Sequence, residues 1–494
     1  MAGSSARAAR SWSSSWSARA TTGCARSSRC SPAPPRRTMS EARSTKPGAA
    51  RQATLYRALD GAGAGDGVRT VEELRAAALA AYEHLDLPSW RRSGFWTTSL
   101  RDLDVESLQP HHVEADGQVP AVVAEALKGD EPAGLLVQRD ATVVHVWLDP
   151  ELAERGVVLC SLEDAVRDHP ELVAEYFMRR LTYDRHKLEA AAGAFWTGGA
   201  FLYVPPGLVV ERPFQLAYVI DEPGTAQYAH TLAIGGESSD FRLREYDLAG
   251  GFEGPALHAG GFELYLEANA RCRLAHFQDW GGEGQEVHDV STHVVRVARD
   301  GHCQWIPIHL GGRLTRQHLE LSTAEPGADM RHRGIYFTEA EEHLDLFTVD
   351  LHEVGPTTGD TVWKGAATGH SRASYEGLIK IRAGAQESHT YLQTHSMMLS
   401  PRAKVDAIPS LIVETDSVSA SHGGTVGEVD ETQVFYMRSR GLSRQDAVRV
   451  IVEGYFEPIV VQLGDERLEG LVRERIAAKL ARADEDIEAY AAAR

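Results

Sequence analysis

Residues 375–418 read YEGLIKIRAGAQESHTYLQTHSMMLSPRAKVDAIPSLIVETDSV. Short runs of alternating apolar and polar residues in this stretch are separated by the corners Gly-Ala-Gln (384–386) and Arg-Ala-Lys (402–404). A period of two is typical of β-strands, because successive side chains point to opposite faces of the sheet. The stretch therefore predicts strands joined by short polar corners.

The same pattern extends back over residues 195–425, with further corners at 327–329 (Gly-Ala-Asp) and 369–371 (Gly-His-Ser). Helical stripes are absent, and few Asn-Gly turns of the kind an antiparallel meander uses are present. Rungs made of a strand and a corner can stack into one continuous core, so the pattern favours a parallel β-helix. The corners are unevenly spaced, so periodicity alone does not give the register of the rungs. The strand-like runs include FRLREYD, FELYLEA, HVVRVA, HCQWIPIHL and GIYFTE.

Helical patterns flank the strand-rich region on both sides. Thr70 and Glu73 form a capping box before one helix, and Asp430 and Ser443 are N-cap residues of two later helices. The helices at the C-terminal end are expected to cap the open rungs, to offer a docking surface, or both. The predicted segments are a disordered tail or mis-assigned start (1–50), a mainly helical domain (51–190), a parallel β-helix (191–427) and a C-terminal helical domain (428–494).

Composition excludes several classes of protein. A hydrophobic fraction of 43% and a charged fraction of 24% are ordinary for a globular chain, which argues against wholesale disorder. No run approaches the roughly 18 uncharged apolar residues that a membrane-spanning helix needs. The formal charge of −19 opposes sequence-independent binding to nucleic acid. Neither a membrane nor a nucleic acid is expected as a partner.

Two features bear on the compartment. Residues 1–38 carry seven arginines and no Asp, Glu or Lys, so they are either an organelle transit peptide or sequence upstream of a true start at Met39. The five cysteines are scattered, without a C-x-x-C pair, which argues against a disulfide scaffold and a conventional zinc site. A reducing, cytoplasmic compartment is predicted.

Three stretches resemble the SufB/SufD family of iron–sulfur cluster assembly proteins: residues 195–216 (FWTGGAFLYVPPGLVVERPFQL), 375–418, and 421–442 (SHGGTVGEVDETQVFYMRSRGL). The similarity covers about 70–463. It implies a mixed α and β protein with a right-handed parallel β-helix between N- and C-terminal helical domains, which agrees with the strand pattern.

Within that family the chain resembles the SufD branch. His422 is followed by Gly423, in the form S-H-G-x-T-V-G, and no cysteine follows Cys303. The resemblance implies a non-enzymatic subunit of a SUF complex that pairs with a SufB-like paralogue and a SufC-like ATPase. The resemblance does not decide whether the isolated chain forms a homodimer. No tightly bound cofactor is expected in the isolated chain, and a transient iron–sulfur cluster or iron is expected in the complex. The chain lacks G-x-x-x-x-G-K-[ST], so a partner must hydrolyse ATP.

His422 is the candidate iron or cluster ligand at the partner interface. Imidazole suits iron, and histidine can replace cysteine at iron–sulfur centres. Gly423 and Gly424 allow close approach of a partner backbone, although a lone histidine can equally be structural. Aromatic and arginine anchors are typical of interfaces, so a partner-docking helix is predicted, with buried aromatics and solvated charges as the alternative. Its residues are Phe435, Tyr436, Arg438 and Arg440.

Other histidines and cysteines give weaker hypotheses. Stacked rungs can align histidines into a metal-binding column, but solvated corners explain most of those after residue 302, which include His343, His352, His370, His389 and His395. Cys272 and Cys303 lie in apolar runs and are expected to be buried and inert. The alternative function is a carbohydrate-active β-helix enzyme with carboxylates on a concave face.

Overall fold

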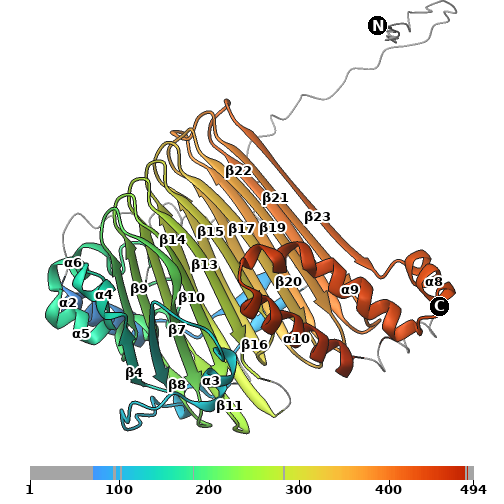
Figure 1. Cartoon of the computed structure of the whole chain (residues 1–494), viewed down its shortest axis with the longest axis horizontal. Coiled ribbons are helices and arrows are strands. Elements are labelled where there is room, and N and C mark those ends of the chain that lie inside the picture. The colour runs from blue at the N-terminus through green and yellow to red at the C-terminus, as the bar shows by residue number, and fades with distance from the viewer. Residues whose placement is uncertain are drawn as a thin grey trace, which may run out of the picture. The chain divides into compact units, whose positions relative to one another are not determined.

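The computed structural model describes residues 70–92, 96–100, 103–181, 183–281, 284–483 and 487. The arginine-rich segment and its two cysteines lie outside these ranges, so both explanations of it stay predictions. Two large sheets dominate the described residues, and the chain alternates between them (Figure 1). Each passage through one strand of each sheet forms one rung of a β-solenoid.

The ten-stranded sheet has the order β23-β21-β19-β17-β15-β13-β10-β7-β3-β4 within the described residues. Its strands are β3 (Gly134–Arg139), β4 (Thr142–Leu148), β7 (Val209–Ile220), β10 (Asp240–Ala249), β13 (Arg271–Asp279), β15 (His302–His309), β17 (Asp329–Thr338), β19 (Thr358–Ala367), β21 (His389–Met398) and β23 (Ser419–Glu428). Every pairing from β3 through β7 to β23 is parallel, and β4 closes the N-terminal edge antiparallel to β3.

The eleven-stranded sheet follows the path β22-β20-β18-β16-β14-β12-β9-β6-β5, with β8 and β11 beside it. Its strands are β5 (Val158–Ser161), β6 (Ala200–Val204), β8 (Ala226–Gln227), β9 (His230–Gly235), β11 (Gly254–His258), β12 (Gly261–Leu266), β14 (Gln285–Val297), β16 (Leu314–Thr323), β18 (His343–His352), β20 (Arg372–Ile381) and β22 (Lys404–Val413). A separate antiparallel pair joins β1 (Ser89–Arg92) to β2 (Trp96–Ser99). The predicted parallel β-helix is confirmed.

Corners between the sheets stack on one another through main-chain hydrogen bonds. The amide of Asn269 donates to the carbonyl of Arg299, and the amide of Asp300 in turn donates to Pro326. Asn269 and Asp300 have positive φ, a conformation that Asn and Asp tolerate better than most residues. The corner triplets 369–371 and 384–386 lie between strands, and the triplets 327–329 and 402–404 end on the first residue of the next strand.

Most strands bury side chains on the face that lines the solenoid interior, and helices cover part of the outer face of each large sheet. The interior holds apolar side chains such as Trp305 and Trp363, and also the stacked thiols Cys272 and Cys303, which are register partners. Burial raises the pKa of Cys303 to about 12 and that of Cys272 well above its ordinary value. The prediction that both cysteines are core residues is confirmed.

Helices cover the outer faces. The N-terminal helices pack on the eleven-stranded sheet, with Leu74 and Leu188 against strand residues such as Leu232. These helices are α2 (Val71–His84), α5 (Leu162–Asp168), α6 (Pro170–Tyr176) and α7 (Lys187–Phe195). Thr70 and Glu73 make the predicted capping box of α2. Two shorter helices are α3 (Ala121–Ala126) and α4 (Pro150–Glu154), and two 3₁₀ turns are η1 (Val105–Ser107) and η2 (Val461–Leu463).

The C-terminal helices are α8 (Glu431–Ser439), α9 (Arg444–Val460) and α10 (Glu466–Arg482), and Asp430 and Ser443 cap α8 and α9 as predicted. The helices α9 and α10 lie across the outside of the ten-stranded sheet (Figure 1). Their apolar side chains pack on that sheet, and the rings of Phe456 and Phe337 lie 6.3 Å apart between centroids. The expectation that these helices cap the open rungs is wrong for α9 and α10. The apolar side chains on the outer face of the ten-stranded sheet pack against the apolar faces of α9 and α10 instead.

Candidate functional site

The solenoid ends at its last rung without a cover from the described residues. β22 and β23 are the terminal strands of the two large sheets, so each presents an unpaired backbone edge. Their residues are mostly exposed or half-buried, whereas nine of the ten residues of the neighbouring β20 are buried. The inward-facing Leu411, Val413 and Val426 are between 36% and 40% exposed, so the apolar interior is open to solvent at this end.

His422 lies on β23, on the face that continues the interior. Its register partner is Leu392, a fully buried residue of the interior cluster. A Cβ built on Gly424, two residues along, would meet Thr394 and Ala407, which confirms that this face of the strand points inward. His422 is nevertheless exposed, because no rung follows it. Its imidazole is therefore presented to whatever docks on the open end.

Within the part of the chain that the structure describes, His422 belongs to no group of three or more metal-capable side chains. Among the described residues, the group of three or more metal-capable side chains is Glu245, His276 and His293, all buried and several rungs away in sequence. An iron site at His422 with three or more protein ligands would need groups from beyond the described residues, such as a partner chain. This agrees with the hypothesis of an interface ligand, which stays a prediction.

Three of the four predicted docking residues lie on α8, and the fourth, Arg440, is its C-cap residue. Phe435 is 73% and Tyr436 is 58% exposed, while Val434 is the buried residue of this helix. Arg440 donates a hydrogen bond to the Tyr436 hydroxyl at 3.1 Å, and its guanidinium lies 5.2 Å from the ring centroid. Arg438 belongs to the last turn of the same helix. The alternative of buried aromatics is excluded, since both rings face solvent.

The other named histidines do not form a column. His352 is buried and contacts the hydroxyls of Thr323 and Thr357, and burial lowers its pKa to about 4. His395 lies 2.8 Å from the Thr425 hydroxyl of β23, which ties the last two strands together. Three lie at strand ends or corners, in line with the structural explanation: His343, His370 and His389.

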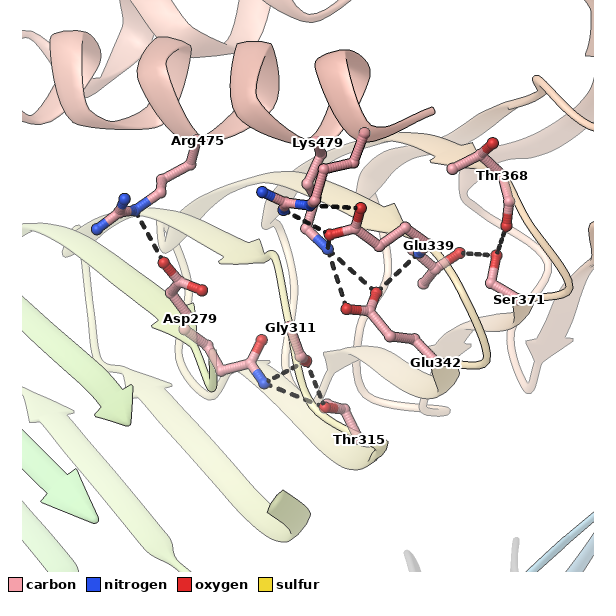
Figure 2. Close-up of polar contacts among 12 residues, drawn as sticks. Asp279, Gly311, Thr315, Glu339, Glu342, Thr368, Ser371, Arg475 and Lys479 are labelled. Atoms are coloured by element: carbon pink, nitrogen blue, oxygen red, sulfur yellow. Dashed lines mark hydrogen bonds and ion pairs between the residues drawn. The ribbon is translucent and has the colours of Figure 1, made fainter. Parts of the chain in front are cut away.

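A buried ionic cluster fixes α10 to the solenoid (Figure 2). Lys479 of α10 donates to Glu339 Oε1 at 2.9 Å and to Glu342 Oε1 at 3.0 Å, and Arg482 also pairs with Glu339. Burial raises the pKa of Glu342 to about 7, despite the nearby ammonium. About one turn before Lys479 in α10, Arg475 forms an ion pair with Asp279 at 2.9 Å.

The sequence did not reveal the buried group Glu245, His276 and His293. Glu245 and His276 are register partners on β10 and β13, and His293 faces them from β14 of the other sheet. Their separation in sequence matches that of stacked residues such as Cys272 and Cys303. These three residues could have been grouped from the sequence only if the register of the rungs had been known.

The fold and its open end define a parallel β-solenoid protein with helices packed on its flanks. Comparison with protein families matches residues 218–455 to the SufBD core domain of the SUF system for FeS cluster assembly, and residues 51–216 to the SufBD protein N-terminal region. The chain belongs to the SufBD family of iron–sulfur cluster assembly proteins. None of the helices in the described residues is both long and apolar enough to span a membrane.

Curated relatives agree. An iron–sulfur cluster assembly SufBD family protein of Staphylococcus epidermidis is 27% identical over 331 residues, which are 67% of this chain and 70% of that protein. The corresponding proteins of Staphylococcus haemolyticus and Staphylococcus aureus are 27% and 26% identical over the same length.

Proposed function

We propose that this chain is a SufD-type, non-enzymatic subunit of a cytoplasmic SUF complex. Its open end pairs with a SufB-like paralogue, and its C-terminal helical segment contacts a SufC-like ATPase. Family membership supports the role in cluster assembly. The pair His422–Gly423 and the absence of any cysteine after Cys303 support the SufD branch.

The observation that carries the pairing is the unfinished last rung. Unpaired strand edges are templates for further strands, and natural proteins usually protect them. Here the edges of β22 and β23 remain accessible, and Leu411 and Val426 expose the apolar interior beside them. A second solenoid with an open end matches both features, because it supplies strand edges and an apolar interior of the same kind. His422 then lies at the junction of the two interiors.

Contact with an ATPase is supported by α8. Its aromatic side chains are large, exposed and stiffened by the Tyr436–Arg440 contact, as is typical of interface anchors. The helix contributes little to the protein's own core, so exposure of these rings is not required by folding. ATP-driven motion of the partner would reach the solenoid through this segment.

The test is co-expression of the full chain with a SufB-like paralogue and a SufC-like ATPase, followed by affinity purification. Val426→Asp places a charge in the apolar junction and should abolish recovery of the paralogue. Val209→Asp is the matched control, since Val209 is also an exposed strand valine, 58% accessible on β7 near the other end of the sheet. Equal recovery of the paralogue with both variants would contradict the pairing.

The same complex tests His422. His422→Ala should leave the complex assembled but lower the iron content and visible absorbance of reconstituted samples, because the site loses one of few ligands. His389→Ala on β21 is the control; His395 is unsuitable because it contacts Thr425 of the last strand. Unchanged iron and absorbance in His422→Ala would remove the ligand assignment.

A further inference from the structure

The interior of the solenoid contains a polar group that the role in complex assembly does not use. Glu245 and His276 project from neighbouring strands of the ten-stranded sheet, and His293 projects from the eleven-stranded sheet opposite. Their ligand-capable atoms all lie within 4.8 Å of one another, and all three residues are buried. We propose that Glu245, His276 and His293 bind a divalent transition-metal ion that links the two sheets inside the solenoid.

The hydrogen bonding of His276 prepares one ring nitrogen for a ligand. Its Nε2 lies 2.5 Å from Asp247 Oδ2, and its Nδ1 is buried with no hydrogen-bond partner among the described residues. Metal-bound histidines usually donate their other ring N–H to a carboxylate, which fixes the tautomer and the ring orientation. Asp247 occupies that supporting position, and Nδ1 remains for the ion.

Glu245 is held in a similar way. Its Oε2 accepts a hydrogen bond from Thr231 at 2.8 Å, which orients the carboxylate and leaves Oε1 available. The His293 ring lies beside two aromatic rings, with its centroid 6.0 Å from that of Trp305 and 5.5 Å from that of Phe262. The three side chains are therefore oriented by their surroundings rather than free to turn into solvent.

The charge around the group favours a cation. Glu245, Asp247 and Asp289 are buried close to one another, and the charged groups that act on Glu245 are these two carboxylates and His276. Buried carboxylates are normally paired with cations or coordinated to metals, because an isolated buried charge is costly. A divalent ion bound at His276 Nδ1 would take the place of a proton there and compensate these carboxylates with its own charge.

Two imidazoles and one carboxylate are a donor set that suits Fe²⁺ and Zn²⁺. Ions of this size bind nitrogen and oxygen at about 2.0–2.2 Å, so their ligand atoms lie roughly 3–4 Å apart. The ligand atoms here lie within 4.8 Å of one another, so side-chain rotation would have to bring them closer together to bind an ion. Hard ions such as Mg²⁺ and Ca²⁺ prefer oxygen ligands throughout and are not expected.

The proposal departs from the sequence-based expectation that the isolated chain holds no tight cofactor. It is independent of the cluster-assembly role, because the ion would be a resident cross-link and not the iron delivered to a cluster. Its test therefore uses the full chain without partners.

The experiment loads chelator-stripped protein with Co²⁺, with Zn²⁺, or with Fe²⁺ under anaerobic conditions, and then desalts it. Metal content and the thermal unfolding midpoint are measured, together with the visible spectrum of the cobalt sample. About one ion per chain, a raised midpoint and a cobalt spectrum of nitrogen and oxygen ligation are expected. Retention of less than about a tenth of an ion, or a thiolate charge-transfer band, would overturn the proposal.

Two variants locate the ion. Glu245→Gln keeps the shape and the Thr231 contact, and His293→Phe keeps a ring beside Trp305; each should weaken retention at least about tenfold. His332→Phe is the matched control, because His332 is also a buried interior imidazole stacked on Trp305, at 5.1 Å. Circular dichroism verifies that every variant is folded. Equal metal retention in folded Glu245→Gln, folded His293→Phe and wild type would refute the site.

Discussion

Replacement of Lys479 by methionine tests how α10 is held to the solenoid. Lys479 is 3% exposed and contacts Glu339 and Glu342 at 2.9–3.2 Å (Figure 2). Methionine keeps the length and apolar stem of the side chain and removes only the charge. The substitution leaves Glu342 without its cation, while Glu339 keeps its contacts with Arg482 at 2.6 and 3.0 Å.

The expected loss follows from this asymmetry. Removal of one partner of a buried ion pair costs about 3–5 kcal/mol, because the other charge stays buried and uncompensated. Arg482 protects Glu339, so the lower end applies, about 3 kcal/mol at pH 8. This corresponds to on the order of a hundredfold easier opening of α10.

The loss should depend on pH. The pKa of Glu342 is raised by burial from its ordinary 4.5 to about 7. A carboxyl with a raised pKa in the folded state contributes stability that is present below pH 4.5 and is lost as the pH rises through 7. At pH 5.5 Glu342 is mostly protonated and needs no cation, so Lys479→Met should then cost only about 1 kcal/mol.

Hydrogen exchange of the α10 amides, followed by mass spectrometry at both pH values, measures the effect. Glu342→Gln should remove the pH dependence of α10 opening between 4.5 and 7, and it should rescue Lys479→Met when the two changes are combined. The reasoning fails if Lys479→Met accelerates exchange equally at pH 5.5 and pH 8, or if the double variant exchanges as fast as the single one.

Three further results are expected. Gly334→Ala should destabilise the fold by about 1–3 kcal/mol and lower the thermal unfolding midpoint, because the added Cβ would lie 2.3 Å from the Trp363 ring. Gly423→Ala should leave the midpoint unchanged, because no atom lies within 4 Å of a Cβ added there. Equal midpoints for the two variants would contradict the packing around Gly334. Cys272 and Cys303 should resist alkylation in the folded protein and react after unfolding, as peptide mass mapping would show; rapid native labelling would contradict their burial. The purified chain should hydrolyse no ATP above a buffer blank, and sustained turnover free of contaminants would contradict a non-enzymatic role.

Local signals in the sequence favoured a solenoid, and the family resemblance of three stretches supported the same fold. Alternating runs and polar corners identify strands and turns, and Thr70 and Ser443 cap helices through side-chain contacts within a few residues. His422 and the segment that forms α8 could be singled out from the chemistry of their side chains, from the neighbouring glycines and from the resemblance of residues 421–442 to a known family. Such features depend on neighbours along the chain, which the sequence displays directly.

The register of the rungs and the placement of α9 could not be predicted in this way. Strands buried on both faces lose a clear alternation, so the outward Ile306 and the inward Trp305 look alike in sequence. An amphipathic helix reveals that it has an apolar face, but not which sheet will cover that face. The group of Glu245, His276 and His293 depends on register across two sheets, and corners of unequal length conceal that register.

The open last rung has a consequence for local order. In a stacked architecture each layer is stabilised mainly by the layers on either side, so the chain behaves almost as a one-dimensional array. The layer formed by β22 and β23 has such a neighbour on one side only. It is therefore where fraying begins, and His422 lies in it. A protein that stacks on this end supplies the missing neighbour, so capture of a partner and rigidification of the histidine become a single event.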